Sequence, residues 1–218
     1  MSAYGDIQTA TSNVVLRPTT WSTKNGHYLT VHHVKRSLVG PGLLNYLNAT
    51  FAKVVEEGRT YPQEGEMGHE AFLKYFFAGD VFLAIIGTSG ANEPTPLETC
   101  GGEWEKYVAG FYYVKPNYPG RSSHICNAGF VVPAMHQGAG YGFALAQSYL
   151  HYAPRLGYKA SVFNLVYVNN IASVKLWERL GFVKAGRIPR AGRLRTKDGE
   201  DEEYVDAWVF YKEFEKET

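Results

Sequence analysis

The six consecutive residues Gln137-Gly138-Ala139-Gly140-Tyr141-Gly142 are the part of this sequence best suited to binding a charged ligand. Glycines let a backbone turn tightly and approach a ligand closely. The segment lies between an apolar run that ends at Val132 and a helical pattern that begins near Tyr141. Because the start of a helix leaves N–H groups unpaired and carries partial positive charge, the segment predicts a site for phosphate groups.

Other interpretations of this loop are weaker or less informative. A glycine-rich turn that binds nothing is the plain alternative, since short motifs have real false-positive rates. The loop contains no Gly-x-Gly-x-x-Gly, and no Gly-Lys-Ser/Thr follows it. A Rossmann dinucleotide site and a P-loop are therefore both disfavoured.

The periodicity of apolar residues predicts the elements that position this loop. Helical spacing predicts helices over residues 42–57, 69–77, 141–156 and 171–180, and dense apolar runs predict strands over 81–87, 107–114, 125–132, 159–168, 182–188 and 205–211. Residues 1–40 are expected to form an irregular lead-in, and residues 88–106 an inserted loop. The order of elements predicts one α+β domain over residues 1–218, an architecture called α/β in some schemes.

Composition limits the class of protein and its partners. The chain has 218 residues, a net charge of +1 and two cysteines, Cys100 and Cys126. This charge gives no general reason to bind nucleic acid or an anionic membrane, and the cysteines form neither a disulfide framework nor a metal site. With no apolar run of membrane length and no leader pattern, a cytoplasmic protein is expected, with the mitochondrion as the alternative.

Two motifs resemble the signatures of the GNAT superfamily of acetyltransferases. Gln137-x-x-Gly140-x-Gly142 is similar to the Q/R-x-x-G-x-G/A element, and Asn170-x-x-Ser173-x-x-x-Trp177 with Gly181-Phe182 resembles the N-x-x-A-x-x-x-Y-x-x-x-G-F element. The resemblance implies a GNAT fold, with a mixed, mostly antiparallel sheet and a V-shaped splay between two strands. It also implies acetyl-CoA as co-substrate, with no metal.

The resemblance implies a division of labour in holding the co-substrate. The backbone of residues 137–142 would hold the pyrophosphate of coenzyme A. The pantetheine arm would enter the splay between residues 125–132 and 160–167, where it would meet the backbone of Phe130, Val131 and Val132. Asn170, Ser173 and Trp177 would contact the same arm.

Further segments resemble fungal acetyltransferases that detoxify the proline analogue azetidine-2-carboxylate. They include Thr60-Tyr61-Pro62-Gln63, Cys126-Asn127-Ala128-Gly129-Phe130 and Phe163-Asn164-Leu165-Val166. This resemblance implies transfer of acetyl to the ring nitrogen of a small cyclic imino acid, and a homodimer. Asn127 would be the catalytic and substrate-orienting residue, Asn164 would contact the substrate from the facing strand, and Tyr61 would close over the ring.

The sequence departs from the GNAT pattern at both acid–base positions. No Glu occurs between Arg121 and Gln147, where many relatives carry the general base, and Trp177 takes the place of the usual Tyr acid. Asn127 can accept from an amine or orient a water, but it cannot act as a base near pH 7. His124 and Cys126 are alternative bases, and both are expected to be structural.

The sequence is compatible with several alternatives. The acceptor could instead be an amino sugar, a polyamine or a protein amine, and the missing Glu and Tyr also allow a non-catalytic acyl-CoA-binding module. The arginines at 187, 190, 193 and 195 are interpreted as a solvated loop, with an acceptor carboxylate or the 3′-phosphate of coenzyme A as possible partners.

Overall fold

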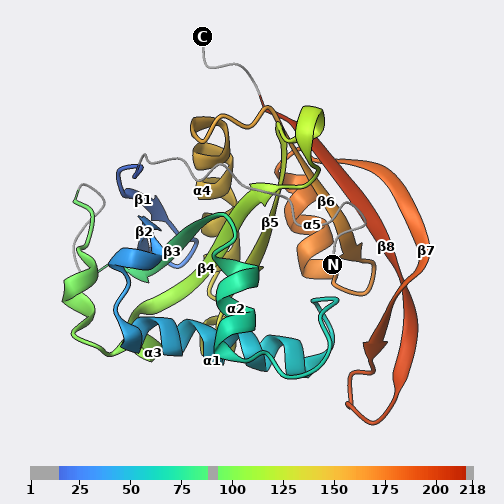
Figure 1. Ribbon diagram of the computed structural model, residues 1–218, viewed down its shortest axis with the longest axis horizontal. Coiled ribbons are helices and arrows are strands. Elements are labelled where there is room, and N and C mark those ends of the chain that lie inside the picture. The colour runs from blue at the N-terminus through green and yellow to red at the C-terminus, as the bar shows by residue number, and fades with distance from the viewer. Residues whose placement is uncertain (1–14, 88–92, 215–218) are drawn as a thin grey trace.

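A single eight-stranded sheet organises the chain (Figure 1). The structure is a computed structural model that describes residues 15–87 and 93–214. The strand order is β1-β2-β3-β4-β5-β6-β8-β7, and every neighbouring pair is antiparallel except β5–β6. The strands are β1 (Thr19–Ser22), β2 (Tyr28–Val34), β3 (Asp80–Ile86), β4 (Val108–Pro116), β5 (Ile125–Val131), β6 (Ala160–Tyr167), β7 (Val183–Arg195) and β8 (Glu202–Glu213). The predicted mixed, mostly antiparallel α+β fold is confirmed.

Helices cover both faces of the sheet and create two hydrophobic cores (Figure 1). Helices α1 (Pro41–Glu57) and α2 (His69–Phe76) pack on one face, which we call the α1/α2 face. Helices α4 (Tyr141–Arg155) and α5 (Ile171–Arg179) pack on the other. Short helical turns occupy Arg36–Leu38, Leu97–Cys100, Trp104–Tyr107 (α3), Gly120–Ser122 and Ala134–His136.

Strand alternation decides which face each residue of β5 serves. Cys126 points to the α4/α5 face, where its sulfur lies 3.1 Å from the Tyr149 hydroxyl. Gly129 belongs to the α1/α2 face, because a Cβ atom there would lie 2.7 Å from the Tyr61 hydroxyl and 2.6 Å from the Tyr113 ring. Asn127, two residues before Gly129, therefore shares the α1/α2 face.

The expected irregular lead-in over residues 1–40 is wrong where the structure describes it. Strands β1 and β2 form a hairpin that continues the sheet beyond β3, while residues 1–14 lie outside the described chain. The apolar period of β2 is interrupted by two buried histidines. His33 is held by Asp80 at 2.9 Å and His32 by the Thr95 carbonyl at 2.9 Å, so both are satisfied by partners distant in sequence.

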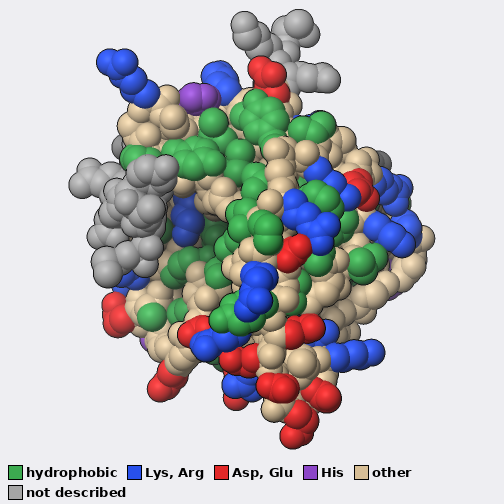
Figure 2. Space-filling model, turned by 90° about the vertical axis from the view of Figure 1, so that its right-hand side faces the viewer, with side chains coloured by type: hydrophobic (Ala, Val, Ile, Leu, Met, Phe, Trp, Pro, Cys, Tyr) green, Lys and Arg blue, Asp and Glu red, His purple; other side chains and the backbone are tan. Residues whose placement is uncertain are grey.

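Two other segments also differ from expectation. The arginine run does not form a loop but lies on β7, whose hairpin with β8 extends well past the ends expected for both strands. Of the inserted loop over residues 88–106, the described part, 93–106, contains the helical turn Leu97–Cys100 and the start of α3. Figure 2 shows charged side chains of both signs on the β7–β8 side, with acidic ones gathered at its lower end.

Candidate active site

Strands β5 and β6 diverge after only two paired residues. Their parallel pairing joins Ile125 to Ala160 and Cys126 to Ser161, and it ends there. On its other side β5 stays paired with β4 as far as Val131. The edge of β5 that faces β6 is consequently open from Asn127 onward, which is the splay that the sequence analysis anticipated between these strands.

Three asparagine amides meet where the splay begins. The Asn117 Oδ1 atom accepts hydrogen bonds from Nδ2 of Asn127 and from Nδ2 of Asn164, both at 2.7 Å. The Asn117 Nδ2 group donates to Asn164 Oδ1 at 3.2 Å. The structure thus brings together the two predicted substrate residues, and these bonds leave the Asn127 Oδ1 atom available as an acceptor.

Asn117 is the member of this cluster that the sequence analysis did not identify. It follows Pro116 at the end of β4, where a Pro-Asn pair indicates a turn. Its side chain is buried, and its backbone N–H donates to the Ile125 carbonyl at 2.8 Å. A β-bulge between Phe163 and Val166 aims Asn164 toward it.

Tyr61 lies beside the asparagine cluster on the α1/α2 face. Its hydroxyl donates to the Phe130 carbonyl at 3.1 Å, and its ring packs edge-on against Phe51 at 5.0 Å. Burial raises the pKa of Tyr61 well above its ordinary value, so the hydroxyl stays protonated at neutral pH. Tyr61 therefore ties the loop after α1 to the backbone of β5.

The loop before α4 has the conformation of an anion site. Gly138 and Gly140 adopt φ values of 80° and 82°, a region that disfavours other residues. No heavy atom would lie within 4 Å of a Cβ at Gly138 or Gly142 apart from their own chain neighbours and local helix backbone, so the space above the loop is open. Tyr141 opens the helix with its ring buried, and no side chain caps this terminus. The Phe143 N–H donates to the Gly140 carbonyl at 3.2 Å, while the N–H groups of Tyr141 and Gly142 have no acceptor within α4, as at any helix start.

Two basic residues that the sequence analysis did not identify lie near this loop. Lys24, in the β1–β2 turn, has its backbone nitrogen 3.9 Å from the position of a Cβ at Gly140. Arg179, at the end of α5, stacks its guanidinium 4.3 Å from the ring of Phe143 in the first turn of α4. The positive charge of Arg179 favours an anion at this helix terminus.

The second motif forms the start of α5. The Asn170 side chain caps the helix by accepting from the Ser173 N–H at 3.2 Å, and the Trp177 indole donates to Ser173 Oγ at 3.1 Å. Trp177 is buried, with its ring 4.3 Å from that of Phe163. These contacts give all three residues structural roles, and their predicted contact with pantetheine remains a prediction.

The alternative bases are poorly placed for proton transfer. Burial raises the pKa of Cys126 to about 12, although the Tyr149 hydroxyl bonds its sulfur, and the sulfur faces α4 rather than the asparagines. His124 is exposed and bonds the Arg121 carbonyl at 3.1 Å. Neither residue supplies a base on the α1/α2 face.

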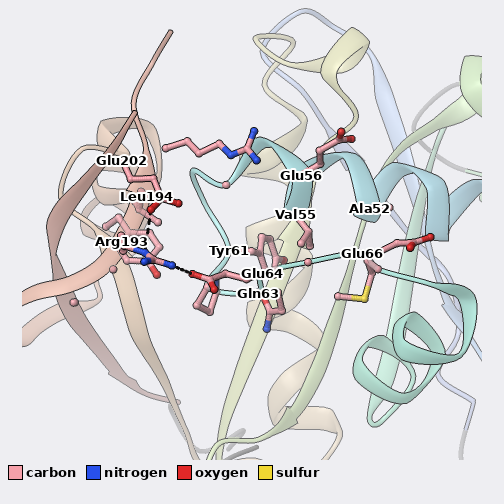
Figure 3. Close-up of a pocket in the computed structure, with 18 residues that line it drawn as sticks. Ala52, Val55, Glu56, Tyr61, Gln63, Glu64, Glu66, Arg193, Leu194 and Glu202 are labelled. Atoms are coloured by element: carbon pink, nitrogen blue, oxygen red, sulfur yellow. Dashed lines mark hydrogen bonds and ion pairs between the residues drawn. The ribbon is translucent and has the colours of Figure 1, made fainter. Parts of the chain in front are cut away.

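A hollow of about 640 Å³ opens between the loop after α1 and the β7–β8 hairpin (Figure 3). Tyr61 forms part of its wall. Arg193 spans the rim, where it pairs with Glu64 and Glu202, each at 3.1 Å. Because Glu56 and Glu66 also line the hollow, the lining contains four carboxylates against two guanidiniums, those of Arg193 and Arg195.

Neither a metal site nor a membrane span is found in the described part of the chain. Residues 15–87 and 93–214 contain no group of three or more His, Cys, Asp or Glu side chains placed to hold a metal ion. Within the same residues, no helix has both the length and the apolar character that crossing a membrane requires.

Comparison with known proteins agrees with this geometry. Residues 60–182 match the model of the acetyltransferase (GNAT) family. N-acetyltransferase aca1 of Schizosaccharomyces pombe is 42% identical over 172 residues, which cover 79% of this chain and 80% of that protein. Protein SPT10 of Saccharomyces cerevisiae is 29% identical over 79% of this chain but only 31% of its own length.

Solved structures show the same fold. A GCN5-related N-acetyltransferase from Kribbella flavida superposes with a TM-score of 0.67 at 26% identity, covering 85% of this chain and 97% of that one. The yncA protein of Salmonella typhimurium, solved with its cofactor acetyl-CoA, gives 0.63 at 16% identity, covering 87% and 96%.

This chain therefore belongs to the GNAT family of acetyltransferases. It is an acetyl-CoA-dependent N-acetyltransferase, and acetyl-CoA is its co-substrate. The open glycine loop and the unpaired edge of β5 fit the pyrophosphate and the pantetheine arm of that co-substrate.

Proposed function

We propose that this enzyme acetylates the ring nitrogen of a small cyclic imino acid, azetidine-2-carboxylate or a proline-related metabolite, by direct attack in a ternary complex. The observation that carries the proposal is the Asn117–Asn127–Asn164 cluster at the mouth of the splay. A neutral amide acceptor suits a secondary amine, because that amine has a single N–H to donate once it is deprotonated.

In this proposal each residue has a defined task. Acetyl-CoA supplies an activated thioester, held by the backbone of residues 137–142 and of Phe130 to Val132. Asn127 Oδ1 accepts the N–H of the neutral acceptor amine, and Asn164 contacts the acceptor from the facing strand. Tyr61 closes the acceptor side, because its hydroxyl lies over Gly129 on the same face as Asn127.

Because the usual Glu base and Tyr acid are missing, the protons in this mechanism are exchanged with water. A carbon–nitrogen bond forms, the carbon–sulfur bond breaks, and the nitrogen loses one proton to water ordered by Asn127. Trp177 does not protonate the leaving thiolate, since its indole N–H is buried and bonded to Ser173. The thiolate takes its proton from solvent, so no protein base or acid is consumed.

A second candidate acceptor carries additional positive charge, as a polyamine or a peptide amine does. The four glutamates that line the hollow beside Tyr61 favour such an acceptor electrostatically. A third possibility, a module that binds acyl-CoA without turnover, predicts binding with no release of thiol.

An acceptor panel tests the proposal directly. Thiol release from acetyl-CoA is measured with azetidine-2-carboxylate, proline, a diamine and a lysine-rich peptide, and each product is identified by mass. We expect turnover with azetidine-2-carboxylate and its loss in Asn127→Ala, while coenzyme A still binds. Turnover of the diamine or peptide alone would instead establish the second candidate.

The resemblance to imino acid acetyltransferases also suggests a homodimer and a detoxifying role in the cytoplasm or mitochondrion. Light scattering on the purified chain measures the assembly. A single mass equal to one chain at all concentrations would refute the dimer.

A further inference from the structure

Lys115 is a basic residue of the acceptor face that the proposed mechanism leaves without a task. It lies on β4 directly across from Asn127 of β5. Alternation places it on the α1/α2 face with Phe111 and Tyr113. Directly opposed residues of antiparallel strands have Cβ atoms about 4.5–5.5 Å apart, so Lys115 and Asn127 are immediate neighbours.

Aromatic rings hold the ammonium group between α2 and the sheet. The Lys115 Nζ atom lies 4.2 Å from the ring centroid of Tyr75 and 4.2 Å from that of Tyr113. It donates one hydrogen bond, to the Tyr75 carbonyl at 3.3 Å. An ammonium has three donors, so two remain for other acceptors.

No carboxylate neutralises this charge in residues 15–87 and 93–214. None of the ion pairs found there includes Lys115. Asp80, on neighbouring β3, belongs to the opposite face of the sheet and is already held by His33 and Lys35. Burial lowers the pKa of Lys115 to about 8, with no negative charge nearby to raise it again.

We propose that Lys115 recognises the carboxylate of the acceptor and disfavours acceptors that bring a second positive charge. This inference rests on the proposed function and deepens it. A partly desolvated ammonium with free donors binds a carboxylate well, because hydrogen bonds between charged partners are the strong ones. In an imino acid the carboxylate lies two bonds from the ring nitrogen, which matches a lysine adjacent to Asn127.

The charge of Lys115 also explains how an acceptor with a carboxylate is selected although four glutamates line the hollow. The carboxylates that line the hollow attract any cationic amine. Lys115 is not among the lining residues and instead lies beside Asn127, the residue that receives the nitrogen. A zwitterionic acceptor satisfies both sites, while a diamine places a cation against Lys115. Selection for the carboxylate therefore operates where the acceptor nitrogen is oriented.

The test compares two acceptors that differ only in the carboxylate, azetidine-2-carboxylate and azetidine. Lys115→Met should lower kcat/KM for azetidine-2-carboxylate roughly 10- to 100-fold, mainly through KM, since a hydrogen bond between charged groups is lost. Azetidine should be acetylated about as well as before. Lys115→Arg should restore most of the activity, because it keeps the charge.

A matched control and a pH profile separate recognition from stability. Lys106→Met removes an exposed lysine that also lies over a tyrosine ring, and it should change kcat/KM for neither acceptor. In the wild type, KM for azetidine-2-carboxylate should rise as pH passes about 8, where Lys115 loses its charge. Tyr75 and Tyr113, which face Lys115 from α2 and β4, stay neutral there because burial raises the pKa of both. Lys115→Arg should remove this rise.

The possible outcomes separate this inference from the proposed function. Equal losses for azetidine-2-carboxylate and azetidine, or no loss for either, would overturn the role of Lys115. If the wild type acetylated neither compound, the proposed acceptor would be wrong, and an α-amino acid with its decarboxylated amine would then give the same comparison. If Lys115→Met failed to fold, the pH dependence of KM in the wild type and in Lys115→Arg would test the role of Lys115 without it.

Discussion

Asn117 should be as important as the two asparagines that it joins, and the substitution Asn117→Ala tests this. The variant removes two hydrogen bonds accepted by Oδ1 and one donated by Nδ2. At about 1 kcal/mol net for each bond, the full loss is about 3 kcal/mol. Because Asn164 is exposed, water can replace part of the lost hydrogen bonding there. We therefore expect the free energy of unfolding to fall by about 2 kcal/mol.

Two assays measure the effect of Asn117→Ala. For a chain of this size a loss of about 2 kcal/mol corresponds to a fall in Tm of roughly 4–8 °C. Because Asn127 and Asn164 lose their shared anchor, kcat/KM for azetidine-2-carboxylate should fall about 10- to 100-fold. Affinity for coenzyme A should not change, since the phosphate loop lies on a different element.

A control variant isolates the cluster from general effects of removing an amide. Asn45→Ala changes an exposed asparagine on α1 and should leave both Tm and kcat/KM near the wild-type values. If Asn117→Ala had the same Tm and kcat/KM as Asn45→Ala, the cluster would not position Asn127 and Asn164, and the role of Asn117 would be refuted.

Three further perturbations test other parts of the structure. Gly140→Glu should abolish the binding of coenzyme A in calorimetry, because it places a negative charge next to the pyrophosphate at a residue with positive φ. The control Gly199→Glu, at a residue with a similar φ of 79° on the β7–β8 hairpin, should bind coenzyme A normally. Equal affinities for the two variants would contradict the loop assignment. Burial acts to raise the pKa of Asp80, but hydrogen bonds from His33 and Lys35 outweigh it and leave this pKa below its ordinary value of 3.8. The carboxylate therefore stabilises the fold at higher pH and loses this effect as pH falls through its folded pKa. The difference in unfolding free energy between wild type and Asp80→Asn, measured by urea titration, should narrow below about pH 3.8. A difference that stays constant with pH would refute this role of Asp80. Both cysteines are buried, and burial raises the pKa of Cys126 to about 12, so neither should react with an alkylating reagent at pH 8 until urea is added; rapid native labelling would show that the core opens.

Most of the fold could be predicted from the sequence where one hydrophobic period dominated. The helices α1, α4 and α5 and the central strands lie close to their expected residues, since each presents a continuous apolar face. The glycine loop could also be located, because its spacing and its position between two elements carry the signal. The expected lead-in was wrong at β1 and β2, where polar residues and two buried histidines hide the strand period.

The candidate site was only partly predictable, because its members depend on register. Asn127 and Asn164 were inferred from resemblance, but their partner Asn117 resembles a turn residue in the sequence. Lys115 gains its significance only from the pairing of β4 with β5 and from the packing of α2. Neither relation leaves a periodic pattern in one strand, so single-sequence reasoning has no signal to find it.

The most direct test of the account is a crystal structure with coenzyme A and azetidine-2-carboxylate bound together. It should show the pantetheine arm between β5 and β6, the ring nitrogen within hydrogen-bond distance of Asn127 Oδ1, and the carboxylate at Lys115 Nζ. An acceptor bound elsewhere, or a coenzyme that bypasses the loop over residues 137–142, would contradict it.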